Sequence, residues 1–148
     1  MIRPATPADA PRLAQIYNHY IEHTIISFER DLVSDIEMAQ RLESVTATHP
    51  WLVKLAGDTI VGYAYASQWQ ERWGYRYSAQ SAIYIASEHT GAGHGRSLYA
   101  DLFARLGELD VHTVIAGISL PNPASIAIHE SFGFIKAAHF SRVGRKFD

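Results

Sequence analysis

The chain of 148 residues contains no cysteine. This absence excludes disulfides, thiolate zinc sites and a cysteine nucleophile together. The sequence also lacks a membrane-length apolar run, and its first residues lack the apolar core of a signal peptide. Its net charge of −2 gives no electrostatic reason to expect a nucleic acid or an anionic membrane as a partner. We therefore expect a soluble, cytoplasmic protein.

Length and apolar content predict a single domain over residues 1–148, since 47% of the residues are hydrophobic and no repeat or linker interrupts the chain. Apolar periodicity and cap residues predict the order β, α, α, β, β, β, α, β, α, β. The expected strands are residues 2–4, 51–55, 60–67, 77–86, 113–119 and 134–143. This order predicts an α/β domain with a mixed sheet and a parallel strand pair that flanks the third helix.

Cap residues place the helix boundaries. Thr6 followed by Pro7 predicts the start of the first helix, and Ser34-x-x-Glu37 predicts a capping box before the second. Asn122 followed by Pro123 predicts the start of the last helix, and Gly133 is expected to end it in the left-handed conformation.

A glycine-rich loop lies between the strand at 77–86 and the third helix. It reads Gly91-Ala92-Gly93-His94-Gly95 and is followed by Arg96. With so little side-chain bulk, its N–H groups can approach an anion at the positive end of the following helix. The loop is therefore either a cradle for a phosphate or a tight turn required only for packing.

Two common phosphate motifs do not fit this loop. A P-loop requires a longer glycine spacing followed by Lys-Ser or Lys-Thr, and here the residue after the last glycine is Arg96. A dinucleotide fingerprint requires an acidic residue at the end of the following strand, and residues 114–119 contain none.

A second motif, His19-Tyr20-Ile21-Glu22-His23, matches the H-x-x-E-H pattern of a zinc protease helix. Tyr20 and Ile21 belong to the apolar stripe of the first helix, and no third ligand is indicated by its spacing. Because short motifs often match by chance, we predict no metal site.

The order of elements, together with Thr90-Gly91-Ala92-Gly93-His94-Gly95 and the segment from Asn122 through His129 to Phe134, resembles the GNAT superfamily of N-acetyltransferases. Both glycines of the superfamily loop match, whereas Thr90 replaces its usual Gln or Arg. Tyr17-Asn18-His19-Tyr20-Ile21-Glu22 and Ser81-Ala82-Ile83-Tyr84-Ile85 resemble the phosphinothricin and methionine sulfoximine acetyltransferase branch. The resemblance spans essentially the whole chain and implies the mostly antiparallel GNAT sheet.

This resemblance implies an acetyl-CoA-dependent N-acetyltransferase that acts on a small, amino acid-like amine. The pyrophosphate of acetyl-CoA is expected on residues 91–96, and its pantetheine arm beside the strand. The implied cofactor-binding residues are Ile83, Tyr84, Ile85, Gly91, Ala92, Gly93, His94, Gly95, Arg96, Asn122 and Ser125.

The expected proton acceptor departs from the branch, whose members carry a glutamate where this chain has Gln80. A glutamine amide cannot accept a proton at neutral pH, although it can orient a water or the amine. Glu22 or Glu29 is then an alternative base acting through water. Three interpretations stay open: an active enzyme with an altered relay, a weakened enzyme, and a silent acyl-CoA-binding module.

His129 occupies the position where many superfamily members have a tyrosine acting as general acid, so it is either catalytic or a buried structural histidine. The resemblance also implies an acceptor site built from Phe28, Tyr75, Arg76 and Tyr77. Arg76 suits a carboxylate through a bidentate pair, or it is an exposed loop cation.

Residues 143–148 match a family segment that leads into one more strand. We therefore expect the strand at 134–143 to present an unpaired edge, so that either the chain is a shortened version lacking a final C-terminal strand or a partner subunit covers the edge. The branch implies a homodimer.

Overall fold

The computed structural model describes residues 1–147 and contains five strands and four α-helices in these residues. The strands are β1 (Ile2–Pro4), β2 (Trp51–Ala56), β3 (Thr59–Gln68), β4 (Ser78–Ile85) and β5 (Thr113–Ile115). The helices are α1 (Ala10–His23), α2 (Asp35–Thr46), α3 (His94–Leu106) and α4 (Pro123–Ser131). Short 3₁₀ turns cover Pro7–Asp9, Trp73–Tyr75 and Ser87–His89.

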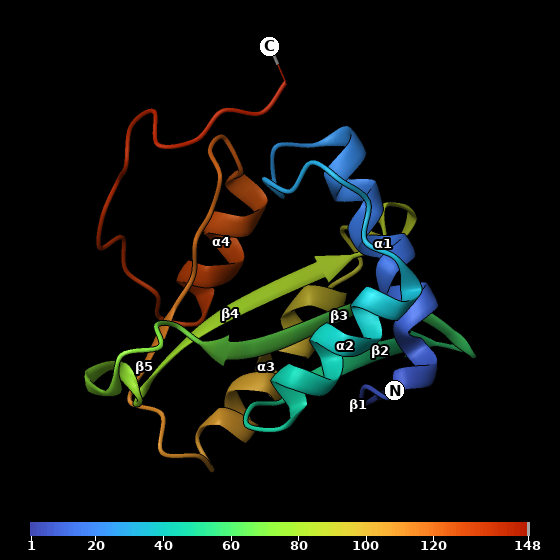
Figure 1. Cartoon of the computed structure of the whole chain (residues 1–148), viewed down its shortest axis with the longest axis horizontal. Coiled ribbons are helices and arrows are strands. Elements are labelled where there is room, and N and C mark those ends of the chain that lie inside the picture. Colours follow the sequence, from blue (N-terminus) through green and yellow to red (C-terminus); the bar gives the residue numbers. More distant parts are fainter. Residues whose placement is uncertain (148) are drawn as a thin grey trace.

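The sheet has the order β1-β2-β3-β4-β5 (Figure 1). All neighbouring strands are antiparallel except β4 and β5, which are parallel and joined through α3. The predicted α/β class, mixed sheet and parallel pair are therefore confirmed. Helices α1 and α2 cover one face of the sheet and α3 covers the other, which gives the molecule two apolar clusters.

Alternation along the strands divides the side chains between these clusters. In β2, Trp51 and Val53 pack on the α1–α2 side, whereas Leu52 packs on the α3 side. In β4, Ala79 packs on the α3 side and Tyr84 on the α1–α2 side. Residues two apart in a strand share a face, so Gln80 and Ala82 lie on the α1–α2 face together with Tyr84.

The predicted cap residues are found, with two differences. Thr6 caps the 3₁₀ turn, and the α-helix itself begins at Ala10. Ser34 Oγ accepts a hydrogen bond from the N–H of Glu37 at 3.2 Å. The Glu37 carboxylate, however, pairs with Arg41 at 2.5 Å and does not return to Ser34, so only half of the capping box forms.

The two last predicted strands differ from the structure. β5 ends at Ile115 and not at residue 119, because β4 and β5 pair only through Ser78–Gln80 and Thr113–Ile115. Residues 134–143 form no strand, and Gly133 precedes them in the left-handed conformation with φ of +84°. Within residues 1–147 this segment has no neighbouring strand, and Ile135 is 86% exposed, so neither pairing nor burial stabilises an extended strand. Asp148, the end of the predicted C-terminal match, lies outside the described residues.

Among residues 1–147, no helix is both long and apolar enough to cross a membrane.

Candidate active site

The β4 strand has one edge that is only partly paired. Its β3 side is hydrogen-bonded along the whole strand, whereas its β5 side is paired only at Ser78–Gln80. The N–H of Ala86 donates to Val61 of β3, so the backbone groups of residues 81, 83 and 85 point away from β3. In the part of the chain that the structure describes, no strand covers these groups. An extended ligand is therefore able to pair with β4 here.

Among the three predicted strand contacts, the structure distinguishes backbone from side chain. Ile83 and Ile85 direct their amides to the open edge, and the Ile85 carbonyl already accepts a hydrogen bond from the Tyr20 hydroxyl at 2.5 Å. The backbone of Tyr84 faces β3, and its ring packs edge-on against Tyr17 on the α1–α2 face. Tyr84 therefore contributes a side chain to that face and no amide to the open edge.

The glycine loop leads from the C-terminal end of β4 into α3. Gly91 and Gly93 have φ of +78° and +77°, a left-handed conformation that side chains rarely adopt. A Cβ atom at either residue would meet nothing within 4 Å, so the space above the loop is open. Gly93 is the N-cap of α3, and the first N–H groups of the helix have no acceptor within it. These residues fit the predicted anion cradle.

Gly95 has a packing role instead. A Cβ atom there would lie 3.0 Å from Ile128 Cδ1 of α4 and 3.4 Å from Ile83 Cδ1 of β4. The glycine loop therefore has features of both a phosphate cradle and a packing turn. Gly91 and Gly93 provide the left-handed backbone conformation, and Gly95 allows β4, α3 and α4 to pack closely. Thr90 Oγ1 donates to the Ser87 carbonyl at 3.1 Å and closes the preceding turn.

The remaining predicted residues are in the loop, in α3 and at the start of α4. Ala92 and Arg96 are exposed and His94 is half-buried. Asn122 caps α4, because its Oδ1 accepts a hydrogen bond from the N–H of Ser125 at 3.1 Å.

His129 is buried, with 5% of its surface exposed, and both ring nitrogens have partners. Nδ1 lies 2.6 Å from the Ser125 carbonyl, and Nε2 lies 2.9 Å from the Tyr99 hydroxyl. That hydroxyl is also 3.5 Å from Ser81 Oγ of β4. Burial raises the pKa of Tyr99 to about 12. These contacts link α4, α3 and β4, and a buried histidine with partners on both ring nitrogens is expected of a structural residue.

Gln80 lies at the point where β4 separates from β5. It is exposed, is in register with Ser67 of β3 and Ile115 of β5, and has no side-chain hydrogen bond among the described residues. Glu22 is also exposed, but it lines a different cavity of about 410 Å³ together with Ala86, beyond the other end of β4. Six residues of strand between Gln80 and Ala86 correspond to about 20 Å. The structure therefore does not bring Gln80 and Glu22 together.

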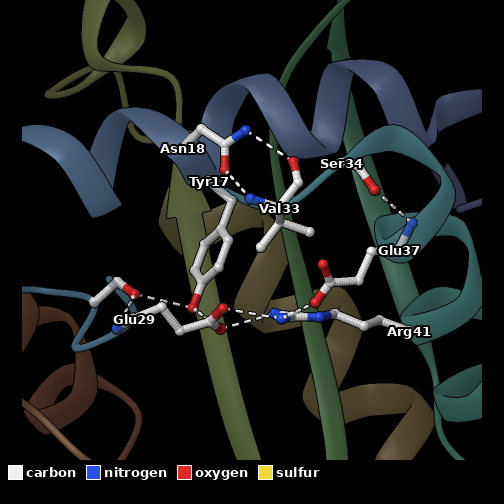
Figure 2. Close-up of polar contacts among 8 residues, drawn as sticks. Tyr17, Asn18, Glu29, Val33, Ser34, Glu37 and Arg41 are labelled. Atoms are coloured by element: carbon white, nitrogen blue, oxygen red, sulfur yellow. Dashed lines mark hydrogen bonds and ion pairs between the residues drawn. The ribbon is translucent and has the colours of Figure 1, made fainter. Parts of the chain in front are cut away.

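Glu29, the other alternative base, is fully engaged. It accepts a hydrogen bond from the Tyr17 hydroxyl at 2.7 Å and forms a bidentate pair with Arg41 at 2.7 and 2.9 Å (Figure 2). The hydrogen bonds from Arg41 hold the pKa of Glu29 below its usual value. Such a carboxylate is a weak proton acceptor.

A cavity of about 460 Å³ lies between α2 and the sheet. Its lining includes Tyr17, Arg41, Trp51, Tyr63, Tyr65 and Ser67. Sequence reasoning missed this site. The sequence does contain one relevant pattern, since Tyr63, Tyr65 and Ser67 are spaced two apart and so share one face of a strand. The pattern does not show that Trp51 of the neighbouring strand pairs with Tyr65 and forms an aromatic wall with it.

The four predicted acceptor residues do not line this cavity. The Arg76 guanidinium lies 3.4 Å from the centre of the Trp73 ring and 4.0 Å from that of Tyr77, and it donates to the Tyr77 hydroxyl. Tyr75 packs edge-on against Trp69 in the same loop. Phe28 packs against Gly144, where a Cβ atom would overlap its ring.

The H-x-x-E-H residues do not assemble a metal centre. His19 and His23 stack with ring centres 4.9 Å apart. In residues 1–147 no group of three His, Cys, Asp or Glu side chains is placed to hold a metal ion.

The partly paired β4 edge beside a glycine loop and helix N-terminus defines the class of protein: the chain belongs to the GNAT acetyltransferases. The family model described as "Acetyltransferase (GNAT) domain" matches residues 2–148.

Individual members of the family are also similar to this chain. The chain is 35% identical over 150 residues to a phosphinothricin N-acetyltransferase of Streptomyces coelicolor, covering 99% of this chain and 88% of the relative. It is 33% identical over 147 residues to an L-methionine sulfoximine/L-methionine sulfone acetyltransferase of Salmonella typhimurium, covering 99% and 86%.

A solved structure of the same family has a closely similar fold. The phosphinothricin acetyltransferase of Sinorhizobium meliloti in complex with AcCoA has a TM-score of 0.95 and 32% identity, covering 99% of this chain and 80% of that one.

Proposed function

We propose that this chain transfers the acetyl group of acetyl-CoA to the amine of a small, amino acid-like substrate. The observation that carries the proposal is the open edge of β4 beside the glycine loop, because this pairing site leads from an anion cradle to Gln80. The pantetheine amides would pair with Ile83 and Ile85, and the pyrophosphate would lie on the N–H groups of residues 91–96. Asn122 and Ser125 would face the arm from α4.

The reaction forms a C–N bond and breaks a C–S bond. The neutral amine attacks the thioester carbonyl, an N–H group at the β4 edge stabilises the oxyanion, and coenzyme A leaves as a thiolate that takes up a proton. The amine must lose a proton, and Gln80 cannot accept it. Because Gln80 is exposed, a water held by its Oε1 would pass this proton to solvent.

The relatives favour a catalytically active enzyme over an inactive acyl-CoA-binding module. They are named as acetyltransferases, so the alternative of a silent acyl-CoA-binding module gains no support from them. The relatives also bear on which amine accepts the acetyl group. Relatives named for phosphinothricin and for methionine sulfoximine are both similar to this chain, so an amino acid of either kind is our proposed substrate class.

The proposal is tested by following free thiol release from acetyl-CoA with a panel of amino acids that includes phosphinothricin, methionine sulfoximine and methionine sulfone. We expect saturable release that requires an amine. Tight binding of acetyl-CoA without release by any amine would refute acetyl transfer and leave only coenzyme A binding.

We also propose a homodimer. Its support is the C-terminal segment, where Ile135, Phe140 and Val143 are 86%, 74% and 73% exposed. Apolar side chains gathered on one segment favour contact with a partner. Light scattering on the eluting protein should give twice the chain mass, and a stable monomer would overturn this part. A cytoplasmic location stays a prediction.

A further inference from the structure

Two histidines lie on either side of the glycine loop. His89 ends the 3₁₀ turn before the loop, and His94 is the first residue of α3 after it. Their rings meet edge to face with centres 6.3 Å apart. Both residues are half-buried, and within residues 1–147 neither ring takes part in a hydrogen bond or an ion pair. The ring nitrogens are therefore available to a ligand on the loop.

The glycine loop has little permanent positive charge of its own. Arg96 is the one Lys or Arg within residues 86–97, and its guanidinium lies 5.8 Å from the centre of the Phe132 ring. The N-terminus of α3 adds roughly half a positive charge. A pyrophosphate carries a negative charge on each phosphate group, so these two features leave part of its charge uncompensated. Thr90 does not fill this role, because its hydroxyl already donates to the Ser87 carbonyl.

Histidine suits this role, because it is the side chain that ordinarily gains a positive charge between pH 8 and pH 5. When protonated, the imidazole also donates from both ring nitrogens. A hydrogen bond from a cationic donor to a phosphate oxygen is shorter and stronger than one between neutral groups. Two protonated histidines beside the loop would therefore supply positive charge that Arg96 alone does not.

The acidic residue next to this pair is already neutralised. Glu88 forms an ion pair with Arg12 of α1 at 3.0 Å. Its own backbone N–H and the Arg12 guanidinium lower the pKa of Glu88 to about 2. Glu88 therefore keeps a constant charge between pH 5 and 8 and produces no pH dependence in this range.

Other charged or titratable side chains come from the elements around the loop. β3 and β4 contain no Asp, Glu, Lys, Arg or His, and burial raises the pKa of their tyrosines. The remaining groups are Lys54 of β2, Asp101 and Arg105 further along α3, His129 and Glu130 of α4, and His19, Glu22 and His23 of α1. The three α1 residues line a cavity on the far side of Ser87 and Glu88, so an α1 histidine serves as a control for the pair beside the loop.

We propose that His89 and His94 bind the pyrophosphate of coenzyme A in their protonated form, so that the affinity of the protein for coenzyme A rises as the pH falls from 8 to 5.5. The inference rests on the proposed function and deepens it, because it adds control by pH to the coenzyme A site. Both histidines act as binding residues and take no part in the chemical step.

This dependence has the opposite sign to that of acetyl transfer itself. The complex is favoured at acidic pH, where imidazoles are protonated, and weakens as they lose the proton. The attacking amine must be neutral, which a higher pH favours. We therefore expect the KM of acetyl-CoA and kcat to rise together between pH 6 and 8, and coenzyme A to be released more readily at the alkaline end.

Calorimetric titration of dephospho-coenzyme A at pH 5.5, 6.5 and 8 is the first test. This ligand retains the pyrophosphate and lacks the ribose 3′-phosphate, a monoester that itself changes charge near pH 6 and would obscure the result. We expect its Kd to rise about 5- to 10-fold from pH 5.5 to pH 8, as two partly exposed ion pairs predict. In the double variant His89→Gln/His94→Gln, which keeps an amide donor at each position without the charge, we expect a change of less than about twofold.

Two further measurements separate a ligand contact from a general effect of pH. His23→Gln removes an imidazole from the α1 side of Ser87 and Glu88 and should retain the full pH dependence. Titration at pH 6.5 in buffers of different ionisation enthalpy should show proton uptake on binding by the wild type and none by the double variant. A Kd that does not change with pH, an equal change in the wild type and the double variant, or loss of the dependence in His23→Gln would overturn the inference.

Acetyl-CoA titrated alongside distinguishes this inference from the proposed function. Binding of neither ligand at any pH would refute the coenzyme A site, and the proposed function with it. Binding of acetyl-CoA without binding of dephospho-coenzyme A would show that the pyrophosphate is not the recognised group and would refute the histidine contacts alone. If the double variant abolishes a pH-dependent affinity but no amine is acetylated, the proposed reaction is wrong and the histidine contacts stand.

Discussion

At the scale of single residues, Gln80 and His129 carry the chemical questions that the sequence leaves open. Gln80 is exposed where β4 leaves β5, in the place expected for a proton acceptor, and its amide has no other structural task among the described residues. His129 has the opposite surroundings, because it is buried and both of its nitrogens are used. From exposure and partners we therefore propose that Gln80 faces the reaction and that His129 has a structural role.

Gln80→Glu should raise activity. A carboxylate at this position accepts the proton of the amine directly, and a positioned base contributes on the order of 10²–10⁴-fold to a rate. Because the proposed water relay would supply part of this effect, we expect about a tenfold or larger gain in kcat/KM at pH 8. The gain should fall away on acidification as the new carboxyl becomes protonated. Gln70→Glu adds the same charge in the neighbouring loop and should have no effect, and equal rates in all three proteins would contradict the assignment.

His129→Leu should lower stability more than it lowers chemistry. The substitution removes the ring nitrogens that contact the Tyr99 hydroxyl and the Ser125 carbonyl, which costs on the order of 1–3 kcal/mol in the free energy of unfolding. Urea unfolding measures this loss. In the folded protein we expect kcat to change less than about tenfold, whereas loss of a general acid would cost about 10²-fold or more. A collapse of kcat at unaltered stability would assign His129 to catalysis.

At the scale of secondary structure, we propose the junction of β4 with α3 as the coenzyme A site. Gly93 provides the left-handed N-cap and Gly95 allows Ile83 and Ile128 to close around the helix start. The first turn of α3 and the edge of β4 are thus held in one fixed arrangement.

Gly93→Ala tests this junction. Alanine in the left-handed conformation costs about 1–2 kcal/mol, so either the helix start shifts or the cradle is strained. If this strain destabilises the complex with acetyl-CoA, it should raise the Kd of acetyl-CoA about tenfold, which calorimetry measures. Gly74→Ala is the control, because a Cβ atom there meets nothing and its φ is not left-handed. Equal affinities in the two variants would show that the loop does not hold the ligand.

Local sequence signals predicted much of these elements. Ser34 and Asn122 cap the helices that they were expected to begin, and Gly133 has the expected positive φ. Thr6 caps the 3₁₀ turn that precedes α1. The failures depend on long-range pairing. Residues 134–143 have a strand-like composition but no neighbouring strand in residues 1–147. The Trp51 cavity likewise depends on a register between β2 and β3 that no local pattern specifies.

At the scale of the whole molecule, tyrosine burial links the core to pH. Burial raises the pKa of six tyrosines: Tyr17, Tyr20, Tyr63, Tyr65, Tyr84 and Tyr99. Most of them lie on the α1–α2 face, where Tyr63 stacks on Trp51 and packs at a tilt against Tyr84. The same face therefore carries the aromatic wall and much of the apolar core.

This burial predicts loss of stability at alkaline pH. Above pH 10 the unfolded chain releases phenolic protons that the folded chain retains, so the unfolded state is favoured progressively as the pH rises. Stability is fully present below about pH 10 and is lost toward pH 12, by up to about 1.4 kcal/mol per pH unit for each fully shifted group. Denaturant unfolding at several pH values should show the decline, and phenolate absorbance should appear together with unfolding. Phenolate absorbance of more than two of the eight tyrosines from folded protein near pH 10 would contradict this burial.

The central claim is that the β4 edge and its glycine loop present acetyl-CoA to an amino acid amine. The most direct measurement incubates the purified chain with acetyl-CoA and methionine sulfone and follows free thiol and N-acetylated product together, by absorbance and mass spectrometry. The account predicts equal amounts of both, saturable in each substrate and reduced in Gly93→Ala. Thiol release without acetylated amine, or release that Gly93→Ala does not reduce, would contradict it.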